Sequence, residues 1–160
     1  MRRFAPLLLV AFLFLLQAAS AKSLPSAPAA PQPASAPAPA APGAERRVAL
    51  VIGNGAYAEG PLKNPVNDAR DMAATLRSLG FEVILLENAG LARMEQAVDQ
   101  FWTSLKGGGT GLFFFAGHGM QVKGVNYLMP VDARLVAEQD VKVRCLDVNL
   151  VLGRMENAGN

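Results

Sequence analysis

Apolar and polar positions follow two different periods from about Arg46 onward. Mainly apolar runs at 48–52, 81–86 and 112–115 are typical of strands buried in a parallel sheet. Between them, apolar residues recur at helical spacing over 65–79 and 91–105. Strand, helix, strand, helix, strand at short intervals predicts an α/β fold, with an open, mostly parallel sheet, right-handed crossovers and helices on both faces.

The ends of these elements carry turn and capping residues. Asn64 is expected to cap the first helix, with Pro65 at the first helical position and Gly80 after the last turn. Lys123-Gly124 separates two short extended runs and predicts a hairpin. A closing helix is expected after Asp147. The apolar positions expected on the helices are Val66, Ala69, Met72, Ala73, Leu76 and Leu79, then Leu91, Met94, Val98, Phe101 and Leu105, then Val148, Val151, Leu152 and Met155.

The first 45 residues differ from the rest. Arg2 and Arg3 precede an apolar run at 4–16, and small residues at Ala19 and Ala21 suit a cleavage site, so 1–21 is expected to be a secretory signal peptide. We therefore expect an exported protein, periplasmic or extracellular, with no stable membrane span after cleavage. The alternative is an uncleaved segment that anchors the protein in the inner membrane.

Residues 22–45 are rich in Ala, Pro and Ser, and this composition cannot bury enough apolar surface to offset its ordering entropy. We expect a disordered linker there, followed by one folded domain at 46–160.

Charge and sulfur content exclude several classes of function. Without Arg2 and Arg3, 13 basic residues face 13 acidic ones, so no nucleic-acid partner is expected. One cysteine and one histidine exclude an internal disulfide and a zinc site made of several Cys and His ligands. No metal and no cofactor is expected, although a calcium requirement stays open.

The candidate functional residues lie where the predicted strands end. Ligands of open α/β sheets bind beyond the carboxyl ends of the strands. Gly53-Asn54-Gly55 follows the first strand, Asp68 lies in the first turn of the next helix, and Gly117-His118-Gly119 follows the third strand. An exposed imidazole at this edge is suited to proton transfer, whereas a histidine that only completes a turn is the plainer interpretation.

Four segments resemble the bacterial caspase-like, metacaspase-related cysteine peptidases. They read RVALVIGN at 47–54, LKNPVNDA at 62–69, FFFAGHG at 113–119 and NYLMPVD at 126–132. The resemblance extends from about Arg46 to the end of the chain. It implies a caspase-like fold and cleavage of peptide or protein substrates by a Cys-His dyad, in which a thiolate attacks the carbonyl carbon.

The resemblance also implies roles for three residues. His118 matches the dyad histidine, and the backbone N–H of Gly119 matches one donor to the developing oxyanion. Asp68 matches an acidic residue of the first specificity pocket, which implies cleavage after arginine or lysine. From the residues alone, Asp68 is as readily an acid that complements the helix dipole.

The dyad cysteine is not expected within this chain. Caspases place it about 50 residues after the histidine, and only 42 residues follow His118. We expect the fourth core strand and its cysteine to lie beyond Asn160, or to come from a pairing chain. Cys145 precedes the closing helix rather than following a core strand, so we interpret it as a structural residue.

Two other functions stay open at this stage. A caspase-like domain without its nucleophile would be a non-catalytic interaction module that binds basic peptides or partner domains. A nucleotide-binding module is suggested by Gly53, Gly55 and Ala58, but Gly60-Pro61 delays the helix that should face a phosphate.

Overall fold

The computed structural model describes residues 46–158. The predicted signal peptide and linker, 1–21 and 22–45, lie outside the described residues. Within residues 46–158 no helix is both long and apolar enough to cross a membrane. The elements are β1 (Arg47–Gly53), α1 (Pro65–Ser78), β2 (Glu82–Glu87), α2 (Leu91–Leu105), β3 (Thr110–Ala116), β4 (Gly119–Val122), β5 (Val125–Leu128), α3 (Glu138–Arg144), β6 (Leu146–Asp147) and α4 (Val148–Glu156).

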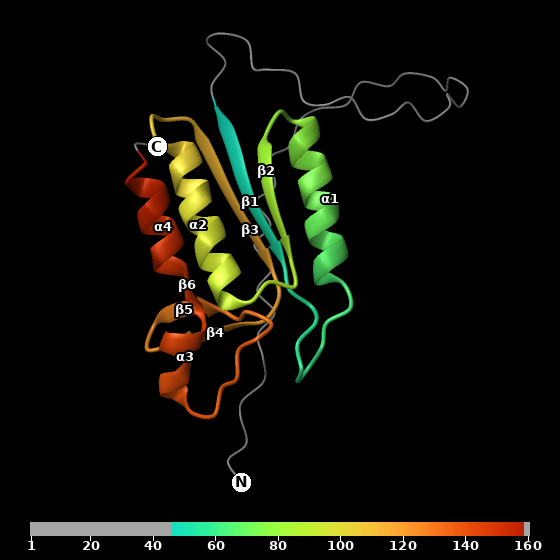
Figure 1. Ribbon diagram of the computed structural model, residues 1–160, viewed down its shortest axis with the longest axis vertical. Helices are drawn as coiled ribbons and strands as arrows, with labels where there is room; N and C mark the ends of the chain where they lie inside the picture. Colours follow the sequence, from blue (N-terminus) through green and yellow to red (C-terminus); the bar gives the residue numbers. More distant parts are fainter. Residues whose placement is uncertain (1–45, 159–160) are drawn as a thin grey trace, which may run out of the picture. The chain divides into compact units, whose positions relative to one another are not determined.

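The main sheet is parallel, with the order β2-β1-β3, so the first strand in sequence is central. Val51 pairs with Leu85 on one side and with Phe114 on the other. Helix α1 covers one face of this sheet, while α2 and α4 lie side by side on the other (Figure 1). This architecture is the α/β fold that the sequence predicts.

Strand β1 supplies both cores of the sheet. Val48, Leu50 and Ile52 are fully buried against α2 and α4. Ala49 and Val51, which point the other way, are fully buried against α1. Burial of each large side chain favours folding by about 1.5 to 3 kcal/mol, so the strand that has no polar residue after Arg47 occupies the centre.

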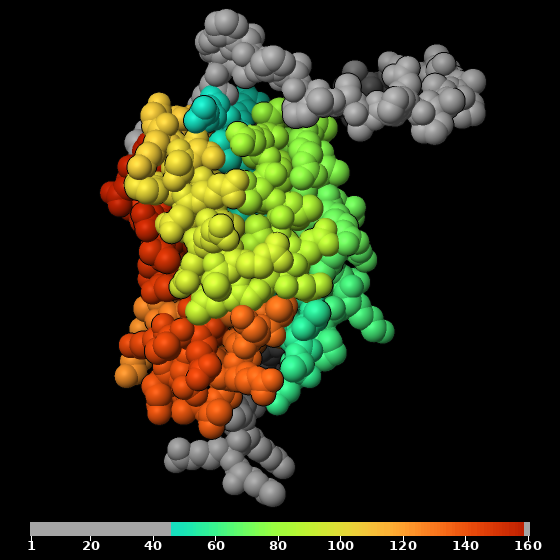
Figure 2. Space-filling view, in the orientation of Figure 1, coloured from blue at the N-terminus to red at the C-terminus, as the bar shows by residue number. Residues whose placement is uncertain are grey.

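A second, smaller sheet has the order β4-β5-β6 and lies beyond the carboxyl ends of β1 and β3 (Figure 1). Lys123 and Gly124 have φ values of 51° and 81°, which both central residues of a type I′ turn require. The predicted hairpin is thereby confirmed. Figure 2 shows α2 in yellow beside α4 in red, above the orange segment that contains the small sheet and α3.

The sequence pattern did not predict α3 or β6. Helix α3 has seven residues and one buried apolar side chain, Val141, so it has no apolar stripe to detect. Its start depends on Asp140, whose carboxylate accepts hydrogen bonds from the backbone N–H groups of Val136 and Ala137. These two donors hold the pKa of Asp140 below its ordinary value.

The predicted side-chain cap of the first helix was wrong, and two apolar positions of the helical pattern are exposed. Leu79 and Leu152 are 56% and 48% exposed. Asn64 occupies the N-cap position of α1, but its side chain makes no capping bond. Its backbone is already helical, at φ −99° and ψ −25°, and this differs from the extended conformation from which a cap side chain bonds the first turn.

Strand β3 forms one edge of the main sheet among the described residues, because β1 is its only partner there. Its apolar residues, Leu112 to Phe115, are half-buried rather than buried as their composition suggested. An edge strand with half-exposed aromatic side chains can pair with a further strand.

Candidate functional site

The imidazole of His118 lies directly after β3, at the carboxyl end of the parallel sheet. It is 8% exposed, so the expectation of an exposed ring was wrong. Nε2 lies 2.6 Å from the carbonyl oxygen of Gly60, in the loop between β1 and α1. A carbonyl oxygen only accepts, so in the neutral ring Nε2 carries the proton and Nδ1 is left as the acceptor.

Tyr57 holds His118 from the same loop. Its hydroxyl accepts a hydrogen bond from the backbone N–H of His118 (3.0 Å) and donates one to the carbonyl oxygen of Met129 (3.1 Å). The backbone N–H of Met129 in turn donates to the carbonyl oxygen of His118 (2.9 Å). The phenol and imidazole ring centroids are 4.4 Å apart. Burial raises the pKa of Tyr57 to about 12, so its hydroxyl keeps its proton at neutral pH.

Asn54 is fully buried beneath this cluster. Its side-chain Nδ2 donates to the carbonyl oxygens of Ala89 (3.2 Å) and Met129 (3.3 Å), and its Oδ1 accepts from the N–H of Ala89 (2.8 Å). Its own backbone N–H donates to the carbonyl oxygen of Ala116 (2.8 Å). One asparagine thus ties the ends of β1 and β3 to the segments that follow β2 and β5.

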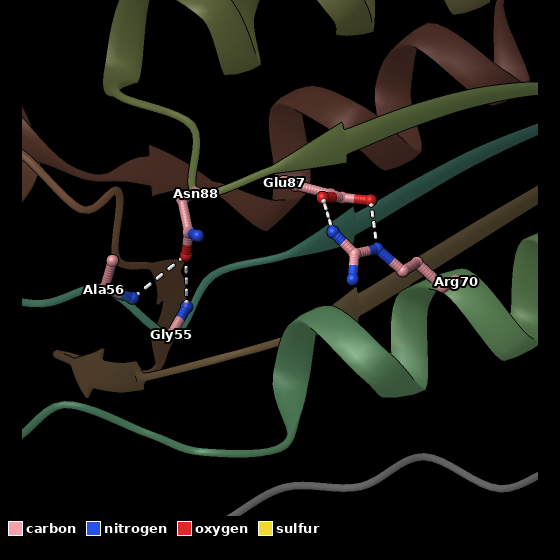
Figure 3. Close-up of polar contacts among 5 residues, drawn as sticks. All are labelled: Gly55, Ala56, Arg70, Glu87 and Asn88. Carbon is pink, nitrogen blue, oxygen red and sulfur yellow. Dashed lines mark hydrogen bonds and ion pairs between the residues drawn. The ribbon is translucent and has the colours of Figure 1, made fainter.

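Asn88 fixes the start of the loop that carries Tyr57. Its Oδ1 accepts hydrogen bonds from the backbone N–H groups of Gly55 and Ala56, each at 2.9 Å (Figure 3). Asn88 has φ 48°, a left-handed conformation that asparagine tolerates better than most residues.

The same bonds argue against a nucleotide site at this turn. A phosphate cradle needs backbone N–H groups that point to the ligand. Here the N–H groups of 54–57 donate to Ala116, Asn88, Asn88 and Gly55 in turn. A Cβ on Gly53 would lie 2.4 Å from the carbonyl oxygen of Pro65, so this glycine permits close approach of α1 to β1.

The glycines beside His118 have different surroundings. A Cβ on Gly117 would lie 2.6 Å from the Tyr57 hydroxyl, so packing against tyrosine excludes any side chain at this position. Gly119 is half-buried, begins β4 and pairs with Leu128. Its role as an oxyanion donor stays a prediction.

Asp68 lies in the first turn of α1, at the same end of the sheet as His118, and is exposed. The first turn of α1 presents its carboxylate to solvent. One half-turn on, Arg70 makes a bidentate ion pair with Glu87 at the end of β2, with N···O distances of 2.7 and 2.6 Å (Figure 3). This pair lowers the pKa of Glu87 and joins α1 to β2.

Cys145 follows α3 and is 5% exposed. It packs against Val122, Tyr127 and Val141. Burial raises the pKa of its thiol to about 11, which keeps it protonated at neutral pH. A protonated thiol is a poor nucleophile, so the surroundings suit the structural role predicted for this residue.

The sequence did not predict most of the residues that contact or support His118. Gly60 was noticed only as a break before the helix, and Tyr57, Asn88 and Met129 were given no role in the site. Their only sequence signal was position, since each lies within a few residues of the carboxyl end of a strand.

The comparisons with known proteins agree with this geometry. The family model described as "Caspase domain" matches residues 46–157. The human mucosa-associated lymphoid tissue lymphoma translocation protein 1 is 42% identical over 93 residues, which are 58% of this chain and 11% of that protein. Its mouse homolog matches with the same identity and coverage. The chain thus spans about a tenth of the length of these curated relatives.

These relatives are mammalian, so a specifically bacterial type stays a prediction. The family match covers more than half of the chain, including helices α1, α2 and α4 and the segment around His118. The parallel sheet covered on both faces has the α/β architecture expected of that family. The chain therefore belongs to the caspase domain family.

Proposed function

We propose that this chain carries the histidine half of a Cys-His dyad in a caspase-like cysteine endopeptidase. One observation carries the proposal: Nε2 of His118 is bonded to the carbonyl oxygen of Gly60, so Nδ1 is available to exchange a proton with a thiol. A ring that is held by one nitrogen and free at the other is what general acid–base catalysis needs.

The proposed reaction passes protons through Nδ1, while Nε2 keeps its hydrogen bond to the carbonyl oxygen of Gly60. Nδ1 takes the proton of the cysteine thiol, and the thiolate attacks the carbonyl carbon of the scissile peptide bond. The backbone N–H of Gly119 stabilises the oxyanion of the tetrahedral intermediate. Collapse breaks the C–N bond, and the imidazolium of His118 donates its proton to the departing amine. Water, deprotonated by Nδ1, then hydrolyses the thioester.

The cysteine is proposed to arrive on a strand that pairs with β3. The partly exposed aromatic side chains of β3 and its position at the sheet edge among residues 46–158 support this placement. A strand added there would end beside His118, because parallel strands share one carboxyl edge. That strand belongs either to a continuation of this polypeptide or to a pairing chain.

We further propose that the enzyme cleaves after arginine or lysine, with Asp68 as the carboxylate that pairs the substrate cation. The side chain of Asp68 is exposed and has no hydrogen-bond or ion-pair partner among residues 46–158, so it is accessible to a guanidinium group. Arg70, in contrast, is already paired with Glu87.

The test of the dyad uses the complete reading frame and arginyl, lysyl and neutral reporter peptides. Wild-type protein is expected to cleave the basic reporters, and His118→Ala to lower kcat by about 10²-fold or more. Cys145→Ala serves as the matched control and is expected to retain activity. Equal turnover of wild type and His118→Ala would overturn the proposal.

A non-catalytic interaction module is the second candidate, and one observation favours it. The single cysteine of the chain is buried, and burial raises the pKa of its thiol to about 11, so residues 46–158 contain no activated thiol. If the complete reading frame adds no cysteine after a strand, and no pairing chain supplies one, then saturable binding of basic peptides without cleavage is expected.

We also propose export through the amino-terminal segment. The arrangement of Arg2, Arg3 and the apolar run 4–16 supports it. Mass spectrometry of the protein from a periplasmic fraction is expected to find Lys22 at the amino terminus. An intact Met1 in the membrane fraction would indicate the uncleaved anchor.

A further inference from the structure

We propose that Tyr57 is a positioning residue for His118, one that fixes the orientation of the imidazole in which Nδ1 is the free acceptor. This inference rests on the proposed role of His118 and deepens it. The carrying observation is that a single side chain touches His118 twice, through a hydroxyl hydrogen bond to the backbone and through the face of its ring.

The hydroxyl of Tyr57 bridges two backbone groups at the open end of the β4–β5 hairpin. It accepts from the N–H of His118 at 3.0 Å and donates to the carbonyl oxygen of Met129 at 3.1 Å. The backbone N–H of Met129 donates in return to the carbonyl oxygen of His118 at 2.9 Å. The Cα of His118 is thus held by hydrogen bonds on both of its flanking peptide groups.

The ring of Tyr57 restricts the imidazole itself. The two ring centroids are 4.4 Å apart, with planes inclined by 41°, so the phenol covers one side of the imidazole. Gly60, three residues after Tyr57, supplies the acceptor for Nε2. One short loop therefore provides both the aromatic ring that packs on the imidazole and the acceptor for Nε2. Together they leave Nδ1 as the nitrogen that points away from the loop.

The loop has its own supports, so Tyr57 is held in place before it acts on His118. The N–H groups of Gly55 and Ala56 donate to Asn88 Oδ1, and the N–H of Tyr57 donates to the carbonyl oxygen of Gly55. Residue 117 must be glycine, because a Cβ at this position would lie 2.6 Å from the Tyr57 hydroxyl. The close approach of Tyr57 to the end of β3 therefore depends on this glycine.

The experiment uses nuclear magnetic resonance on the full 160-residue chain, in which His118 is the single histidine. Its imidazole signals are therefore unambiguous. In the wild type, the nitrogen shifts are expected to report the Nε2–H tautomer, with strong cross-relaxation between the Tyr57 ring protons and the imidazole protons. Tyr57→Phe is expected to mix the tautomers and to speed amide exchange at His118, and Tyr57→Leu to do so further.

Tyr127→Phe is the matched control. Tyr127 is the other tyrosine of the chain and is 5% exposed. A purely structural role for Tyr57 predicts lower melting temperatures for both variants and an unchanged histidine tautomer in each. That result would overturn the inference. If Tyr57→Phe fails to fold, the wild-type spectrum decides, since absent cross-relaxation or an Nδ1–H tautomer contradicts the geometry.

Activity of the complete reading frame separates this inference from the proposed function. If wild type cleaves the basic reporters, Tyr57→Phe is expected to lower kcat about tenfold with little change in KM, because misplacement of a catalytic group costs up to about 10²-fold. An unchanged kcat would overturn the inference alone. An inactive wild type with the expected spectra would refute the peptidase and leave the tyrosine's hold on the ring intact.

Discussion

His118 and Cys145 have opposite surroundings, polar for the imidazole and apolar for the thiol. Each is the single residue of its type in the chain, and the two are similarly buried, at 8% and 5% exposure. His118 has hydrogen-bond partners from two segments, the loop between β1 and α1 and the residue that follows β5. Cys145 is packed among the apolar side chains of the small sheet and α3.

The difference shows that a similar degree of burial can place two groups in very different surroundings. A buried group whose polar partners are fixed has a defined orientation. A buried thiol among apolar groups ionises less readily, because the charged form is desolvated without compensation, as the raised pKa of Cys145 indicates. Four experiments break or sharpen this contrast.

The largest effect is expected from Asn54→Ala on the polar side. Asn54 is fully buried and bonds both peptide groups of Ala89 as well as Met129. Its removal leaves buried donors and acceptors unpaired, so the free energy of unfolding should fall by about 3 kcal/mol. Urea titration measures this. Exposed Asn149→Ala is the control, expected within about 0.5 kcal/mol of wild type. Equal losses in the two variants would show that the hydrogen bonds of the Asn54 side chain contribute little to stability.

A smaller loss is expected when the support of the Tyr57 loop is removed. Asn88→Gly keeps the φ of 48° accessible but deletes the acceptor for Gly55 and Ala56, and should cost about 1 to 2 kcal/mol. Asn88→Asp keeps an acceptor and should lie near wild type. If the glycine variant unfolds like wild type in urea, the loop does not depend on this side chain.

On the apolar side, the raised thiol pKa predicts a pH dependence. Between the ordinary value of 9.0 and about 11, the unfolded chain releases the proton of Cys145 while the folded chain retains it. Unfolding is therefore favoured as pH rises through that window, by at most about 1.4 kcal/mol per pH unit. Tyr57, raised from 10.0 to about 12, adds a further fall above pH 10.

Comparison with Cys145→Ala isolates the thiol. Urea titrations of the two proteins across this range should show a steeper decline for the wild type, beginning near pH 9. Parallel pH profiles would mean that the thiol ionises as readily in the folded protein as in the unfolded one.

Asp68→Asn is expected to have the smallest effect on folding. Asp68 is exposed in the first turn of α1, so its loss should cost less than about 1 kcal/mol, through the helix dipole alone. In the complete reading frame, however, the preference for arginyl over neutral reporters should fall. A preference that is unchanged in this variant would leave Asp68 with the dipole role only.

Much of the fold was predictable because its signals are local. The apolar run that became β1 and the Lys123-Gly124 turn each act within a few residues, and both predictions were confirmed. The prediction of an exposed His118 ring was wrong, because burial depends on what another element places nearby. Helix α3 was not predicted, because its start depends on the carboxylate of Asp140 rather than on apolar periodicity.

The sequence by itself determined the strands and helices of the main sheet, and the position of His118 at the end of one strand. Only the tertiary structure decided what the imidazole meets, because Tyr57 and Gly60 lie 61 and 58 residues away from it along the chain. Periodicity and capping act over a few residues, whereas the partners of a buried ring are set by which loops the sheet order brings together.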